Sequence, residues 1–318
     1  MAHLVETMFS VREKPWHYEL TKEVTKLIQE APTSRDAIRL AGLDWNVNSR
    51  PIYDSFGKEI KGFKANTRDI DNTVLGIVTD KYRIVQNREA FEFTDSLLNN
   101  DEGIEIHYET AGSLKNGRTI WLLAKMPTTT ILGDDIDPYI CFTNSHDRTG
   151  AIKVAMTPIR VVCNNTLTFA LNNAKRCWST KRMGDMNSKL IEAKHTLGLA
   201  TAYMDELNLT AEQMAEKTIT DSQIEQILDE LFPVDKEKDS ERKIRNAQEI
   251  KDSFMTCYYM PDIKQFRNTA WGLTNAMSDL VTHVRPTRES ANYRENNWGR
   301  IINGHPLIDA MNKALVRI

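Results

Sequence analysis

Two short segments contain residues whose types could do chemistry. His146 and Asp147 are adjacent in the segment NSHDRTG, and a histidine beside an aspartate is typical of a general base with its orienting carboxylate. Adjacent residues in a turn rarely converge on one atom, however, and the same residue types suit a tight turn. Asp134, Asp135 and Asp137 form an acidic segment that could hold Mg²⁺ or could be an exposed loop.

Cys163 is a third candidate. It precedes a segment that we expect to be helical, and the positive end of a helix dipole would activate its thiol. It also follows the apolar run Ile159–Val162, so a buried structural cysteine is the favoured interpretation.

Motifs of the common enzyme classes are absent. The chain has no GxxxxGK[ST], no GxGxxG after a strand, no HExxH, no CxxC and no GxSxG. We therefore expect no cofactor and no metal, and a binding protein rather than an enzyme. Whether His146, Asp147 or the acidic segment does chemistry stays open.

A cationic stretch is the strongest local signal. Residues 148–184 hold seven Lys and Arg residues and no acid, although the whole chain has a formal net charge of −3. A solvated basic face or internal ion pairs would give the same composition, but we favour an anionic ligand. The residues expected to contact nucleic acid are Arg148, Lys153, Arg160, Lys175, Arg176, Trp178, Lys181 and Arg182.

The elements that must position these residues follow from the hydrophobic periodicity. Strands alternate with turns rather than with long helices, which argues against a doubly wound parallel sheet. Strands are predicted at 45–54, 58–69, 73–85, 104–114, 118–126, 137–147 and 150–162. Helices are predicted at 19–31, 34–41, 87–99, 163–175, 268–284 and 305–317, and over most of 187–232.

Turn and capping signals support this division. Asn116-Gly117 predicts a tight hairpin turn. Thr210-x-x-Gln213 and Thr220-x-x-Gln223 both match the capping box of a helix start. Residues 235–251 are highly charged and predict a solvated helix or a linker.

The predicted fold class is α+β, with an antiparallel-rich sheet and packed helices followed by an all-helical C-terminal part. We place the domains at 1–186, which includes the cationic stretch, and at 187–318. No apolar run approaches 18 residues, and the N-terminus lacks the pattern of a secretory signal, so we expect no membrane contact. Four cysteines without a paired short spacing indicate reduced thiols, and hence a cytoplasmic location.

Several phrases of the sequence resemble the phage/plasmid-like family, which is catalogued as domain of unknown function 932. The resemblance spans about residues 3–315, and its most specific phrase is TPIRVVCNNTL. The other phrases that carry it are VETMFSVREKPWH, AGLDWNV, KYRIVQNREAFEF, YETAGSLKNGRTIWLLAKMP, TNSHDRTGAIKVAM and AWGLTNAMSDLVTHVRPTR. The resemblance implies a gene carried by mobile elements, and it implies no activity.

The function expected from these observations is nucleic-acid binding, with single-stranded DNA as the favoured ligand. Trp178 lies among these basic residues, and its ring would either stack on a nucleobase or anchor the core. Mobile elements often encode single-strand annealing proteins, which act without ATP in recombination and self-assemble, so a homo-oligomer is possible; this is a fold-level analogy. The alternative is a protein-interaction module, either an inhibitor of host defence or a structural oligomer, and an enzyme is the third possibility.

Overall fold

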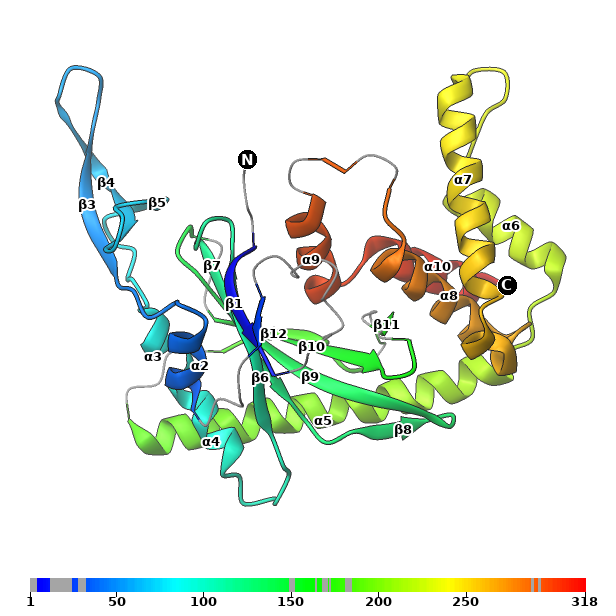
Figure 1. The fold of residues 1–318 in the computed structure, drawn as a ribbon, viewed down its shortest axis with the longest axis horizontal. Coiled ribbons are helices and arrows are strands. Elements are labelled where there is room, and N and C mark those ends of the chain that lie inside the picture. The colour runs from blue at the N-terminus through cyan, green and yellow to red at the C-terminus, as the bar shows by residue number, and fades with distance from the viewer. Residues whose placement is uncertain are drawn as a thin grey trace.

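The computed structural model describes residues 5–11, 25–27, 33–148, 152–163, 165–167, 171, 173–180, 185–286, 289–290 and 293–318. Within this part of the chain, sheets occupy the N-terminal half and helices the C-terminal half, so the fold is α+β as predicted (Figure 1). None of the described helices is long and apolar enough to cross a membrane.

The larger sheet is antiparallel except at one edge, where β1 and β2 are parallel. Its strand order is β11-β10-β9-β7-β6-β1-β2, with β12 beside β10 and β8 beside β9. The strands are β1 (Val5–Ser10), β2 (Thr25–Leu27), β6 (His107–Leu114), β7 (Thr119–Lys125), β8 (Thr129–Ile131), β9 (Asp134–Ser145), β10 (Lys153–Arg160), β11 (Asn165–Thr166) and β12 (Cys177–Ser179).

Three strands form a separate, smaller sheet in the order β3-β4-β5. These strands are β3 (Val47–Tyr53), β4 (Glu59–Arg68) and β5 (Val74–Thr79). Figure 1 shows the hairpin of β3 and β4 projecting from the body, and we call residues 47–80 the β-arm.

Helices pack on both faces of the larger sheet. The short N-terminal helices are α2 (Ser34–Leu40), α3 (Asn87–Phe91), the 3₁₀ turn η1 (Glu92–Thr94) and α4 (Asp95–Leu98). The later helices are α5 (Met186–Glu216), α6 (Asp221–Leu231), α7 (Glu241–Tyr258), the 3₁₀ helix η2 (Pro261–Phe266), α8 (Ala270–His283), α9 (Tyr293–Asn303) and α10 (Pro306–Arg317).

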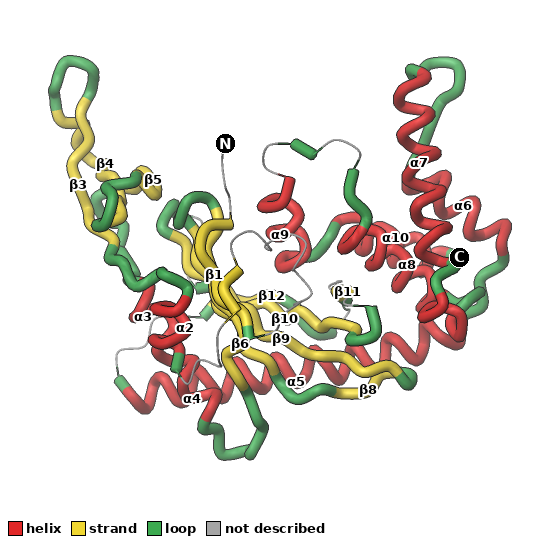
Figure 2. Tube along the Cα trace, in the orientation of Figure 1, coloured by secondary structure: helices red, strands yellow, loops and turns green. Residues whose placement is uncertain are grey.

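The long helix α5 runs along one face of the sheet (Figure 2). Its buried residues recur at three- and four-residue spacing, from Ala193 through Leu197 and Ala200 to Leu207, and they join the main core. A second core cluster covers the opposite face, where Trp298 of α9 packs on Trp121 with ring centroids 4.8 Å apart.

Two predicted helices are corrected by the structure. Residues 25–27, inside the helix predicted at 19–31, form β2, because the backbone pairs in parallel with β1. In the helix predicted at 163–175, Asn165–Thr166 form β11 against β10, and the other described residues there are not helical. The rest of both segments lies outside the described residues. Tertiary pairing therefore outweighed local helical pattern at both places.

Candidate nucleic-acid interface

The structure divides the predicted cationic residues into an exposed and a buried group. Arg148, Lys153 and Lys175 are exposed, whereas Arg160 and Arg176 are buried. Lys181 and Arg182 lie outside the described residues. The cationic stretch is therefore not one continuous positive surface.

Arg160 is a structural residue. Its side chain is 0% exposed, its Nε lies 2.6 Å from Asp134 Oδ2, and its NH1 lies 2.9 Å from Asp262 Oδ2. NH2 donates to the Asp262 backbone oxygen, and the guanidinium lies over the Phe266 ring. Arg160 thus joins β10 to η2 and is not available to a phosphate, which corrects its predicted role.

Arg176 also serves the fold. It is 6% exposed, and its NH1 donates to the backbone oxygens of Met156 and Ile302. Ile302 belongs to the last turn of α9, where a cation is favoured by the helix dipole and by the unsatisfied carbonyls. Its predicted phosphate contact is therefore replaced by a helix-capping contact.

Trp178 is half-buried and packs against the main core. It lies on β12 opposite Val154 of β10, a core residue, so the indole faces the interior side of the sheet. The neighbouring pair on the other face is Lys153 and Ser179, both exposed. Of the two interpretations of Trp178, the packing favours the core anchor.

The hairpin register brings in further cations that the sequence analysis did not single out. Thr119 pairs with Ser145, and His146 N donates to Arg118 O at 2.8 Å, so the β6–β7 and β9–β10 turns lie side by side. The hydroxyl of Tyr82 donates to Ser145 O at 3.1 Å, which adds the loop after β5. We call the exposed cations of these turns the cation end: Lys81, Arg83, Lys115, Arg118, Arg148 and Lys153.

These six side chains are exposed and, among the described residues, form no ion pair with a carboxylate. Lys115 and Arg148 have positive φ angles of 59° and 76°, as tight turns require. Asp147 lies among them; burial, and then the charge of Asp147, raises the pKa of Tyr82. The hairpin signal Asn116-Gly117 with a strand-pairing register could have located this cluster.

His146 is buried rather than poised for catalysis. Its Nε2 lies 2.7 Å from Asn87 Oδ1, and its ring packs edge-on against Trp45. Asn87 Nδ2 donates to Leu43 O, so Oδ1 is the acceptor and the histidine proton sits on Nε2. Burial lowers the pKa of His146 to about 4, although Asp147 opposes that shift. The neutral ring ties Trp45 and Asn87 of α3 to the larger sheet.

The acidic segment and Cys163 are also accounted for by local contacts. Asp134 pairs with Arg160, Asp137 pairs with Lys125 at 3.0 Å, and all three aspartates lie within β9 rather than in an exposed loop. Cys163 follows β10 in a turn, 3.7 Å from Arg160 NH1. Within the described ranges, no group of three or more His, Cys, Asp or Glu side chains is placed to hold a metal ion.

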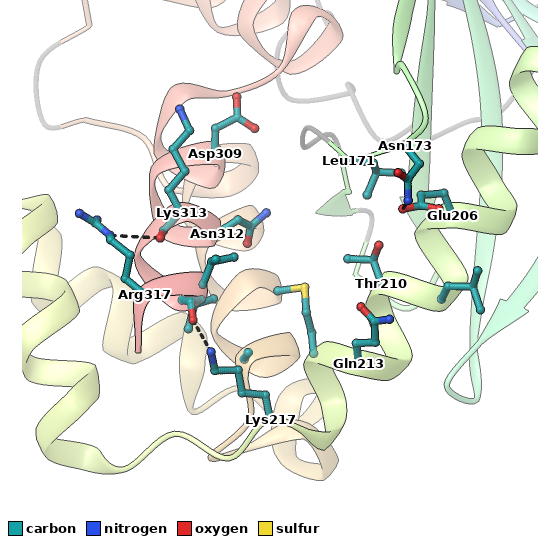
Figure 3. Close-up of a pocket in the computed structure, with 15 residues that line it drawn as sticks. Leu171, Asn173, Glu206, Thr210, Gln213, Lys217, Asp309, Asn312, Lys313 and Arg317 are labelled. Carbon is teal, nitrogen blue, oxygen red and sulfur yellow. Dashed lines mark hydrogen bonds between the residues drawn. The ribbon is translucent and has the colours of Figure 1, made fainter.

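A groove of about 1010 Å³ opens between α5, α8 and α10. Figure 3 shows Glu206, Thr210 and Gln213 of α5 on one side and Asn312 of α10 on the other. Asn312 Oδ1 accepts from Thr274, whereas its buried Nδ2 has no partner among the described residues. The lining is mainly apolar and includes charges of both signs, which suits a protein segment more than a polyphosphate.

Comparison with protein families gives a match over most of the chain. A family model described as a domain of unknown function, DUF932, matches residues 74–299, which include the larger sheet from β6 onward and all helices from α5 to α8. No curated protein and no solved structure matches the chain.

Proposed function

The chain belongs to the DUF932 family, a domain of unknown function. We propose that it binds nucleic acid through the cation end, with single-stranded DNA as the favoured ligand. The observation that carries the proposal is the gathering of six exposed cations without carboxylate partners, within the described residues, at one end of the larger sheet. Phosphate oxygens of a nucleic acid would form ion pairs with such exposed Lys and Arg side chains.

The positive charge of the cation end is a local feature of the molecule. The chain as a whole carries a net charge of −3, so diffuse attraction of polyanions does not follow from overall charge. Binding would depend on these turns and would release counterions from the phosphates. For six contacts with a single strand, the logarithm of affinity would fall with the logarithm of salt concentration with a slope of about −4.

The finer proposal is ATP-independent annealing in the recombination of a mobile element. It is supported by an antiparallel sheet crossed by one long helix, α5, and by the absence of a nucleotide-binding motif in the sequence. This support is an analogy of architecture.

The proposal is tested with the variant Arg118→Gln/Arg148→Gln/Lys153→Gln. We expect it to fold normally, because all three side chains are exposed, and to bind a fluorescent single strand at least about tenfold more weakly, with a shallower salt slope. Fluorescence anisotropy at several salt concentrations measures both quantities. Annealing is followed with complementary strands that carry a donor and a quencher.

The matched control removes three exposed cations from the helical half, Lys236→Gln/Arg242→Gln/Lys264→Gln. This variant has the same change in net charge and should bind like the wild type. Equal losses in both variants would mean that only net charge matters, and the cation end would then not be the site.

The second candidate is a protein-interaction module, and the groove between α5 and α10 is the observation that favours it. A wild-type protein without oligonucleotide affinity, even at low salt, would leave this candidate as the better one.

A further inference from the structure

The β-arm exposes aromatic side chains that the described part of the chain leaves uncovered. Tyr53 is 58% exposed, Phe56 is 93% exposed and Phe63 is 42% exposed. Phe56, at the hairpin tip, is the most exposed large hydrophobic residue in the described chain. Apolar surface concentrated on a projection is typical of a contact site.

The tip that carries Phe56 is held by its own turn. Asp54 Oδ1 accepts hydrogen bonds from the backbone nitrogens of Phe56 and Lys58, both at 2.9 Å. Gly57 has a φ of +77°, which the turn requires and which other residues rarely adopt. The backbone is thus fixed while the Phe56 ring stays in solvent.

Cations without ion pairs accompany these aromatics. Lys58 and Lys61 are exposed and Lys64 is half-buried, and none of the three pairs with a carboxylate within the described residues. Arg50 bonds only an amide oxygen, that of Asn72, among the contacts that the structure gives it.

The other projection of the molecule is the hairpin of α6 and α7 (Figure 1). There Lys251 pairs with Asp229 at 2.6 Å, and Lys243 pairs with Asp239 at 2.8 Å. The β-arm also holds an ion pair, between Arg68 and Asp71 at 2.6 Å near its base, whereas Lys58, Lys61 and Lys64 nearer its tip have no carboxylate partner within the described residues.

We propose that the β-arm is a base-contacting arm, in which Tyr53, Phe56 and Phe63 stack on unpaired bases while Lys58 and Lys61 neutralise the adjoining phosphates. This inference rests on the proposed function, and it names single-stranded nucleic acid as the ligand class. Stacking on aromatic rings requires free base faces, which a duplex hides inside its own stack.

The base of the β-arm lies directly on the cation end. Asn66 Nδ2 donates to His146 O at 2.8 Å, two residues before Arg148. A Cβ on Gly76 would lie 2.7 Å from Asp147 Cα, so β5 rests against the same turn. A single-stranded nucleic acid bound at the cation end would therefore continue directly onto the β-arm, because the two surfaces adjoin.

The test is the double variant Tyr53→Ser/Phe56→Ser, whose side chains are exposed and whose loss leaves the core intact. Binding is measured by anisotropy with a labelled oligothymidylate of about 30 nucleotides and with a duplex of equal length. We expect single-strand affinity to fall about tenfold or more, with the salt slope and the duplex affinity unchanged.

A second measurement maps the contact directly. An oligonucleotide that contains 5-iodouracil, irradiated on the wild-type protein, should cross-link to the peptide that contains Phe56 or Tyr53. The control Ile191→Ser/Val316→Ser removes two exposed apolar residues from α5 and α10 and should bind like the wild type.

The outcomes separate the two proposals. If the wild type binds single strands but the arm variant binds equally well, or cross-links map elsewhere, the arm proposal is overturned and the cation end stands. If the arm variant differs from the wild type in its mass in solution but binds DNA equally well, the arm serves self-association. That result would also overturn the arm proposal. If the wild type binds no oligonucleotide, both proposals fail.

Discussion

Arg160 and Lys153 lie on the same strand, yet their surroundings give them opposite roles. Lys153 is exposed at the start of β10, whereas Arg160 at its end is fully buried between Asp134 and Asp262. A buried guanidinium persists only when carboxylates and carbonyls satisfy its donors, as they do here. Charge in the sequence therefore indicates an available cation only where the fold leaves it in water.

His146 makes a pH-dependent contribution to stability that can be measured. Burial lowers the pKa of His146 to about 4, below the ordinary value of 6.5. Between these values the unfolded chain binds a proton that the folded chain does not, so stability is lost as pH falls below about 6.5. We expect this group alone to remove about 2 kcal/mol of unfolding free energy between pH 7 and pH 5.

The measurement compares urea unfolding of the wild type and His146→Gln at the two pH values. The stability advantage of the wild type should shrink toward pH 5, because only the wild type carries the titrating ring. The variant His195→Gln, at an exposed position, provides the control for the loss of one histidine side chain. A pH-independent difference for His146→Gln would contradict the assignment of a neutral buried ring.

At the scale of elements, two identical sequence signals have different outcomes. Thr220 caps α6, with its side chain accepting from Gln223 N and the Gln223 side chain accepting from Thr220 N. Thr210 lies inside α5, which continues to Glu216, so the capping box predicted there is wrong. We expect Thr220→Ala to lower the unfolding free energy by about 1 kcal/mol.

Thr210→Ala should change stability little or raise it by a few tenths of a kcal/mol, since alanine is the better residue in a helix interior. Chemical denaturation of both variants beside the wild type gives the two values. Equal losses would mean that α5 is interrupted at Thr210 after all.

Most elements could be predicted because their signals are local. The hairpin at Asn116-Gly117 and the capping box at Thr220 both act through near neighbours. The segment 163–175 could not, because β11 exists only through pairing with β10. The cation end depends likewise on the register Thr119–Ser145, which brings Arg118 to the turn that holds Arg148.

At the scale of the whole molecule, the division predicted at residue 186 coincides with the start of α5, but the core does not divide there. The main core cluster contains sheet residues such as Phe142 and Met156 together with Leu273 and Ile308 of the helical half. Helix α5, the first element beyond the boundary, supplies one face of that core. Arg160 adds one ion pair, with Asp262, across the same junction.

We therefore expect the sheet and the helices to unfold together. Tryptophan fluorescence reports on both halves, because the six tryptophans include Trp121 in the sheet and Trp271 in α8, and far-ultraviolet circular dichroism reports mainly on the helices. The two signals should follow one urea transition, because neither half keeps a covered core without the other. A fragment of residues 1–186 lacks α5, and its exposed sheet face should leave it unfolded or aggregated. Two separate transitions, or a fragment that folds alone, would instead establish two independent domains.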